Sequence, residues 1–189
     1  MKKLVALTAA LTIAIFAVIV SDARPALAQM GSVYQTADGV RFVVPVGWHV
    51  VPGQLILIRR LPDTGLSPQC IVTRPAPRPG PRSSQAAVNQ NIASSPFQHS
   101  DWTRILGVSV LSWGSSSTEI INGVVASRIS FRFSASNAPQ VVKVMSAAIL
   151  SQPRRDTLVT CFHYDTAGAT LQSAYQREYE IFLRSITLP

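Results

Sequence analysis

Two cysteines and a histidine are the residues of this sequence best suited to chemistry. Cys161 and His163 lie two positions apart in an apolar, strand-like run, and alternate residues of a strand point to the same face. A thiol nucleophile needs such a neighbouring base, and a soft metal ion could be bound by both residues together with Cys70. One alternative is therefore a thiol- or metal-dependent enzyme that uses Cys161 and His163.

The same cysteines can instead form a disulfide. Cys70 and Cys161 are the only cysteines of the chain, and an even, minimal number in an oxidising compartment favours a single bridge. In the chain-entropy description, a bridge that closes a loop of about 90 residues contributes roughly 4–5 kcal/mol. We expect this disulfide, which would leave no thiol for catalysis or for a metal.

The remaining polar residues do not form a recognisable catalytic set. Segment 114–118 resembles a nucleophile loop only in composition, because Thr118 stands where Gly-x-Ser-x-Gly requires its second glycine. Four aspartates occur in turn-like contexts, where Asp is normally structural: Asp63, Asp101, Asp156 and Asp165. We therefore predict a polar loop at 114–118 and no catalytic residue, metal site or cofactor.

Residues 74–82 form an unusual arginine- and proline-rich arm. Prolines at alternate positions disfavour helix and sheet and favour an extended polyproline-II conformation. With three residues per turn, Arg74, Arg78 and Arg82 would distribute positive charge around the axis. The arm has no interleaved aromatic residues, which argues against single-stranded nucleic acid. The arm is interpreted as a solvated linker, and the functional alternative is an anion-binding contact of Arg74, Arg78 and Arg82 for acidic lipid or protein surfaces.

The first 28 residues have the pattern of a secretory signal. A short basic start precedes an uncharged apolar run over 4–20, and Ala26-Leu27-Ala28 provides small residues for the peptidase. We expect cleavage between Ala28 and Gln29, which leaves 29–189 as one periplasmic or secreted domain that is not transmembrane. The alternative is an uncleaved anchor, since the run is at the short end of the roughly 17–25 residues that span a bilayer. Export also argues against a nucleic-acid role despite the net charge of +8.

The periodicity of the chain predicts which elements position these residues. In the first half we expect strands at 39–45, 48–51, 55–61 and 69–73, then a helix capped by Ser83 or Ser84. We expect residues 97–105 to be a connecting stretch that Trp102 anchors to the core. The first half therefore consists mainly of strands, with one helix.

The second half is predicted to hold four more strands and a closing helix. The strands are expected at 108–113, 128–134, 140–149 and 157–164, and Asn122-Gly123 marks a hairpin turn. A stripe near period 3.6 predicts the helix, with Glu180 and Arg184 paired on its exposed side. The members of the stripe are Leu171, Tyr175, Tyr179, Phe182 and Ile186. About eight strands and two helices indicate an antiparallel α+β sandwich.

Three motifs in this order resemble the PsbP superfamily. They are the strand and turn Gly39-Val40-x-Phe42-x-Val44-Pro45-x-Gly47-Trp48, the mid-chain Ile121-Asn122-Gly123, and the terminal Phe182-Leu183-x-Ser185-Ile186. The resemblance implies an α+β fold with a central antiparallel β-sheet flanked by helices on both faces, a PsbP-like α/β/α sandwich. Members of this superfamily are accessory and binding proteins with unrelated partners, so the resemblance implies little about activity, and the missing catalytic set favours a non-enzymatic role. We therefore expect an exported accessory protein that binds an envelope protein or an anionic surface.

Overall fold

A computed structural model describes residues 31–51, 56–60, 62, 67–79, 83–135 and 138–189. The expected signal segment 1–28, its cleavage site at Ala28 and Gln29, and Arg82 lie outside the described residues. Within them the chain forms nine strands and three helices, one strand and one helix more than the periodicity suggests. The extra strand is a short one at the start, β1 (Val33–Gln35), and the extra helix is α2 (His99–Leu106).

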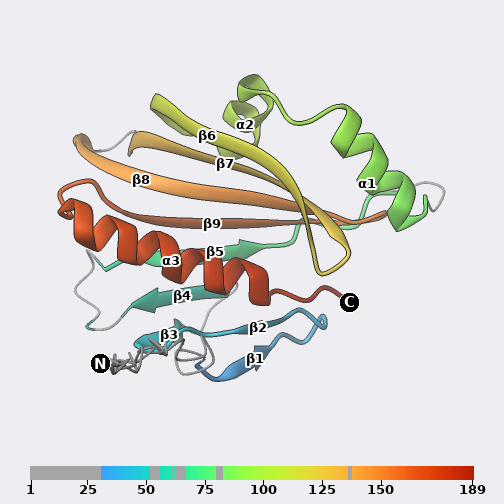
Figure 1. The fold of residues 1–189 in the computed structure, drawn as a ribbon, viewed down its shortest axis with the longest axis horizontal. Coiled ribbons are helices and arrows are strands. Elements are labelled where there is room, and N and C mark those ends of the chain that lie inside the picture. The colour runs from blue at the N-terminus through green and yellow to red at the C-terminus, as the bar shows by residue number, and fades with distance from the viewer. Residues whose placement is uncertain (1–30, 52–55, 61, 63–66, 80–82, 136–137) are drawn as a thin grey trace, which may run out of the picture.

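One large antiparallel sheet organises the described part of the chain (Figure 1). Its strands are β3 (Trp48–Val51), β4 (Ile56–Arg60), β5 (Gln69–Thr73), β6 (Ser109–Ile121), β7 (Val124–Ala135), β8 (Ala138–Ser151) and β9 (Asp156–Tyr164). Their order across the sheet is β3-β4-β5-β9-β8-β7-β6. The long strands β6 to β9 follow one another through short turns, whereas β5 pairs with the distant β9. This pairing brings residues 69–73 beside the C-terminal part of the chain.

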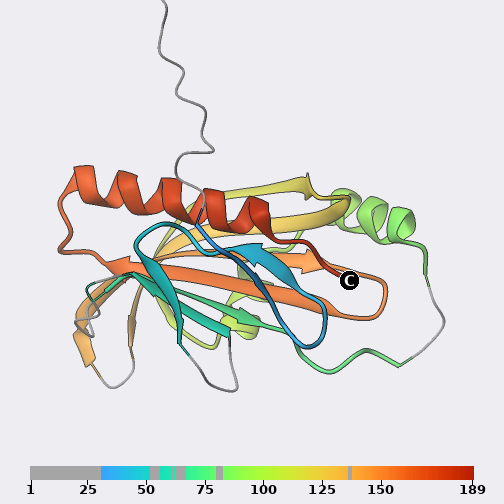
Figure 2. The same ribbon diagram turned by 90° about the horizontal axis from the view of Figure 1, so that it is seen from below.

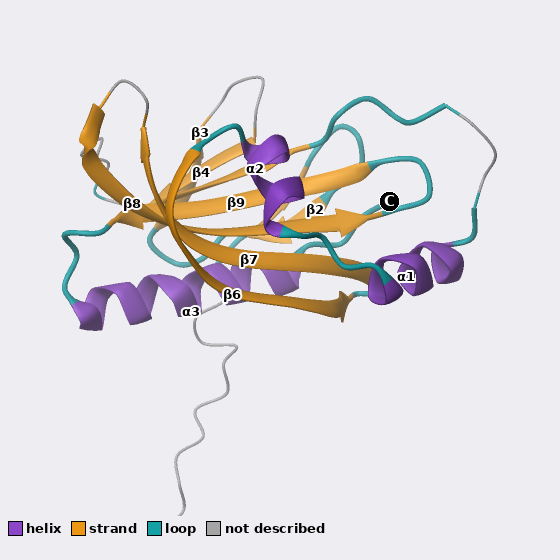
Figure 3. Ribbon diagram, turned by 90° about the horizontal axis from the view of Figure 1, so that it is seen from above, coloured by secondary structure: helices purple, strands orange, loops and turns teal. Residues whose placement is uncertain are grey.

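Helices cover both faces of this sheet, as the resemblance predicts. Helix α3 (Ala169–Ser185) lies along one face, together with the hairpin of β1 (Val33–Gln35) and β2 (Arg41–Val43) (Figure 2). Helix α2 (His99–Leu106) lies on the opposite face, and α1 (Gln85–Ser94) lies at the end of the sheet beside β7 (Figure 3). The expected α+β class and flanking helices are therefore confirmed.

Strand alternation divides the core into two clusters. Under α3, Phe42 packs edge-on against Phe182. On the other face, Trp102 is only 1% exposed and packs with Phe131 and Met145. Because neighbouring residues of a strand point to opposite faces, β7 and β8 supply side chains to both clusters.

The hairpin between β6 and β7 forms at the predicted turn. Asn122 and Gly123 both have positive φ, 49° and 82°, which a two-residue type I′ turn requires. Asn122 also donates hydrogen bonds from Nδ2 to the main-chain oxygens of Arg184 and Ile186, at 3.1 and 2.7 Å. The turn therefore holds the end of α3 against the edge of the sheet.

Two expectations about local structure are wrong. Residues 99–106 form α2 rather than a connection, because Asp101 accepts from the Gln98 main-chain N–H and Gly107 ends the helix in the left-handed region. Residues 114–118 belong to β6 rather than to a polar loop. Gly114 permits this pairing, since a Cβ there would lie 2.4 Å from the Ser130 Oγ.

The stripe of the closing helix is confirmed except at its first member. Tyr175, Tyr179 and Phe182 are buried in α3, and Ile186 is buried just beyond it. Leu171, in contrast, is 49% exposed. Its position in the first turn of α3 explains this difference, because the helix contacts the sheet only farther along.

Candidate functional site

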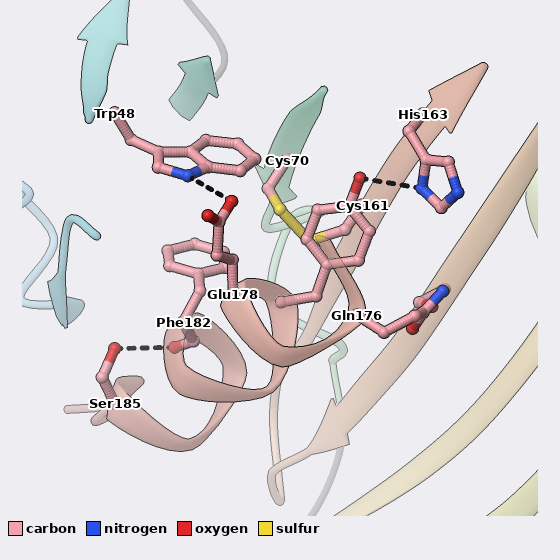
Figure 4. Close-up of a disulfide and its surroundings, with 10 residues drawn as sticks. Trp48, Cys70, Cys161, His163, Gln176, Glu178, Phe182 and Ser185 are labelled. Atoms are coloured by element: carbon pink, nitrogen blue, oxygen red, sulfur yellow. Dashed lines mark hydrogen bonds between the residues drawn. A yellow bond between two sulfur atoms is a disulfide. The ribbon is translucent and has the colours of Figure 1, made fainter. Parts of the chain in front are cut away.

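The predicted disulfide joins Cys70 and Cys161 at the centre of the sheet. The two residues are directly opposite each other on β5 and β9, and their sulfur atoms are 1.98 Å apart. The bridge is buried and lies below α3, between Trp48 and His163 (Figure 4). Because neither cysteine of the chain is free, the alternatives of thiol catalysis and of a soft-metal site at Cys161 have no thiol to use.

His163 shares a face with Cys161, as predicted, but is a core residue. It is 1% exposed, and its Nδ1 is hydrogen-bonded to the Tyr179 hydroxyl at 3.2 Å. Burial lowers the pKa of His163, and the negative charge of Asp165, which acts to raise that pKa, offsets this only in part. Burial likewise raises the pKa of Tyr179 above its ordinary value. This pair is therefore neutral and packed beneath α3.

A hollow lies between α3 and the strands β6 to β9. It has a volume of about 620 Å³, and we call it the α3 groove. Its apolar floor includes Val144, Val159 and the Cys161 side of the disulfide, and Tyr179 and Leu183 line it from α3. Its polar lining comes from Ser112, Ser115, Ser117, Arg128, Ser130, Arg132, Ser146, Gln176 and Glu180.

Several hydroxyl groups of this groove already have partners. The main-chain N–H of Ser115 donates to the Ser130 Oγ at 3.0 Å, and the Ser146 Oγ donates to the Gln176 Oε1 at 2.9 Å. These serines escape sequence reasoning, because a polar residue that alternates with apolar ones is normally taken to face solvent. One signal could have identified Ser130 and Ser146. Strands β7 and β8 are covered on both faces, so polar side chains on either face of these strands lie against another layer of the protein.

An ion-pair network closes the hairpin end of the α3 groove. Arg128 on β7 is paired with both Glu119 on β6 and Glu180 on α3. Arg184 pairs with the same two carboxylates, at 3.0 and 3.2 Å, and its pairing with Glu180 confirms the predicted helix pair. Burial acts to raise the pKa of Glu119, but the hydrogen bond and charge of Arg128, together with Arg184, hold it below its usual range. The network ties α3 to the edge of the sheet.

The outer edge of β6 is the second feature of this region. Within the described residues β6 ends the sheet, so its outer side has no strand partner. The strand has 13 residues and contains neither proline nor lysine, and Glu119 is its only charged residue. Leu111 and Ile120 are each 55% exposed. Natural edge strands are normally protected by charges, proline or a covering segment, and only two irregularities of register with β7 interrupt this one.

The described arginines of the arm lie against the protein. The side chain of Arg74 is only 9% exposed and pairs with Asp38 at 2.7 Å. Arg78 pairs with Asp156 at 2.8 Å, and its main-chain N–H donates to the Arg154 oxygen at 2.6 Å. Residues 74–79 of the arm form neither helix nor strand, and Arg74 and Arg78 direct their charge to carboxylates of the same chain.

The structure contains no metal-type cluster of three or more His, Cys, Asp or Glu side chains in its described part. None of the helices among the described residues is long and apolar enough to cross a membrane.

Comparison with known proteins establishes the fold alone. No protein-family model and no curated protein matches the sequence. LpqN from Mycobacterium tuberculosis, described as involved in cell envelope biogenesis, has a similar structure, with a TM-score of 0.54 at 12% identity over 84% of this chain and 90% of LpqN. A protein of Bacteroides thetaiotaomicron VPI-5482 gives 0.52 at 11% identity over 85% of this chain, which spans about half, 49%, of that protein.

The cyanobacterial PsbP of Synechocystis sp. PCC 6803 is also among the similar structures. Its TM-score is 0.48 at 11% identity, over 85% of this chain and 94% of that protein.

Proposed function

We propose that this chain is an exported, non-enzymatic accessory protein that binds an extended segment of a partner protein along the edge of β6. The buried disulfide supports an oxidising compartment, in agreement with the signal pattern before Gln29. The envelope role given for LpqN agrees with that compartment. The intact mass of the exported protein tests it: we expect a chain that begins at Gln29 and gains two hydrogens on reduction, whereas a retained leader or free thiols would contradict this.

The observation that carries the binding proposal is the unprotected edge of β6. In a two-residue hairpin the pair flanking the turn exchanges main-chain hydrogen bonds, and bonded pairs alternate from there. Ile121 and Val124 flank this turn and pair in regular register back to Ser116. Ser116, Thr118 and Ile120 therefore direct their main-chain groups away from β7. An extended peptide can bind such groups as an additional strand.

The α3 groove supplies selectivity beside that edge. A strand added to β6 would direct alternate side chains toward Ser115, Ser117 and the other polar groups that line the groove. Main-chain bonding would then give affinity, and the side chains that enter the groove would give specificity. We infer a polar segment, because the groove is lined by hydroxyl, amide and charged groups.

A partner protein fits this edge better than a second copy of the chain. Five serines of β6 are exposed: Ser109, Ser112, Ser115, Ser116 and Ser117. Permanent homodimer interfaces are more apolar than this, whereas transient contacts resemble the rest of a protein surface. The polar composition of the edge therefore favours a transient hetero-complex.

Substitution of Thr118 provides the test. Thr118→Pro removes the outward N–H at an edge position where proline is sterically tolerated, and Thr118→Val keeps that N–H as a matched control. Peptides selected from a random ten-residue display library on the purified protein serve as probes. We expect Thr118→Pro to weaken their binding roughly tenfold or more and Thr118→Val to change it little.

Three results would count against the proposal. The first is a selection that yields no peptide that binds the protein. The second is equal peptide affinity for the unmodified protein and for both Thr118 variants. The third is a dimer of the protein whose formation competes with peptide binding. Near-ultraviolet circular dichroism shows whether Thr118→Pro is still folded. A native spectrum means that weaker peptide binding comes from the changed edge of β6 and not from unfolding. If that variant is not folded, Ile120→Pro against Ile120→Val repeats the comparison two residues along.

A further inference from the structure

A second cleft lies between the arm and the turn that joins β8 and β9. It has a volume of about 450 Å³, and we call it the arginine cleft. Arg74 comes from the arm, Arg154 and Arg155 come from the turn, and Asp38 comes from the loop between β1 and β2. The rest of its lining is Pro77, Ser83, Gln152, Pro153 and Pro189. Three arginines and one carboxylate side chain thus line the cleft.

The ion pairs of this cleft leave positive charge uncompensated. Arg74 and Arg155 share the single Asp38, whose Oδ2 lies 2.7 Å from one guanidinium and 3.3 Å from the other. A hydrogen bond from the Thr36 hydroxyl, together with the charge of Arg74, lowers the pKa of Asp38 against its burial, so this carboxylate is already ionised at neutral pH. Arg154 is exposed and forms no ion pair with any of the described residues.

Two buried donors of the cleft also lack an acceptor. The Nε of Arg74 and the Nε of Arg155 are both buried, and neither has a hydrogen-bond partner among the residues that the structure describes. The Arg74 side chain is more than nine-tenths buried. A buried donor that has lost its water and gained no acceptor is destabilising. An anion that enters the cleft can accept from such donors.

We propose that the arginine cleft binds a phosphate group through Arg74, Arg154 and Arg155. A phosphate offers several acceptor oxygens at once, and guanidinium groups match that geometry with paired, charge-assisted hydrogen bonds. The phosphate belongs either to a free anion or to a phospholipid headgroup, and both present the same chemistry to the arginines. This site differs from the anion contact considered from the sequence. It keeps Arg74 and adds Arg154 and Arg155, whereas Arg78 forms an ion pair with Asp156.

The test follows the arginine Nε–H signals of the purified protein by NMR during a titration with inorganic phosphate. We expect the Arg74 and Arg155 signals to shift with phosphate and not with chloride at equal ionic strength. Arg154→Gln and Arg155→Gln should each weaken phosphate binding about tenfold, because each removes hydrogen bonds to a charged group. Arg177→Gln is the matched control, since Arg177 is an exposed arginine of α3 outside the cleft.

Sedimentation with vesicles separates the two sources of phosphate. Vesicles of phosphatidylglycerol and phosphatidylcholine are compared with vesicles of phosphatidylcholine alone, for the unmodified protein and for the Arg154→Gln and Arg177→Gln variants. Sedimentation that needs the anionic lipid and Arg154 assigns the site to a headgroup. Phosphate-dependent NMR shifts without sedimentation assign it to a free anion. Equal shifts with chloride and phosphate, or an Arg154→Gln variant that binds like Arg177→Gln, would overturn the proposal.

Discussion

At the scale of single residues, the disulfide between Cys70 and Cys161 is expected to stabilise the fold. It joins strands whose cysteines are 91 residues apart in sequence, so it restricts a large part of the unfolded chain. We expect the double variant Cys70→Ala, Cys161→Ala to lose about 2–5 kcal/mol of unfolding free energy in urea denaturation. Reduction of the unmodified protein should produce a similar loss. Equal stability of the oxidised protein and the double variant would contradict a structural role for the bridge.

His163 gives the stability of the protein a defined dependence on pH. Its pKa is lowered in the folded state by burial, so below its ordinary value of about 6.5 the unfolded chain binds more protons. Stability contributed by the neutral ring is therefore present at pH 8 and declines as the pH falls below that ordinary value. We expect the melting temperature of His163→Phe to fall less between pH 8 and pH 5 than that of the unmodified protein.

The control for this pH dependence is Tyr179→Phe, which removes the hydroxyl partner of His163 but keeps the imidazole. Tyr179→Phe should be less stable and yet retain most of the decline toward low pH. If His163→Phe and the unmodified protein lose the same stability over this interval, the pH dependence does not arise from His163.

Sequence reasoning predicted residues correctly where one local rule decides their role. Cys70 with Cys161, Asn122 with Gly123, and Ser84 as the N-cap of α1 are of this kind. It could not predict the ion pairs of Arg74 and Arg78, because their partners Asp38 and Asp156 are 36 and 78 residues away in sequence. Long-range pairing of charges leaves no local pattern.

At the scale of elements, the network of Arg128, Glu119, Glu180 and Arg184 determines how α3 sits on the sheet. Arg128→Gln leaves Arg184 as the one cation beside the carboxylates of Glu119 and Glu180, so their mutual repulsion is less fully offset. We expect this variant to lose about 1 kcal/mol in low salt, and the loss should shrink at high salt because screening weakens that repulsion. Thermal denaturation at two salt concentrations measures both effects. Arg177→Gln serves as the control, and a loss as large as that of Arg128→Gln would contradict the role of the network.

The elements that the sequence did not predict have weak or conflicting local signals. Helix α2 has only 8 residues and buries only Trp102, so its apolar positions span about two turns, fewer than the stripes by which longer helices are identified. Residues 114–118 are small and polar, which normally indicates a loop, yet Ser116, Ser117 and Thr118 pair with β7 and the whole segment belongs to β6. Tertiary pairing overrides propensity in this case.

At the scale of the whole molecule, strand alternation and the closing helix made the fold class predictable. The order of the strands in space was not predictable, because the pairing of β5 with β9 joins distant segments. The α3 groove depends on that order, since it lies between a helix at one end of the sequence and strands from its middle. The binding site therefore follows from topology rather than from a motif.

The central claim is that the outer edge of β6 binds an extended segment, and amide hydrogen exchange tests it most directly. Exchange of the free protein is compared with that of the protein bound to a peptide selected on it. We predict that the main-chain amides of Ser116, Thr118 and Ile120 exchange slowly only when the peptide is bound, because they then donate to an added strand. Unchanged exchange at these amides, with protection by the peptide elsewhere, would contradict the claim.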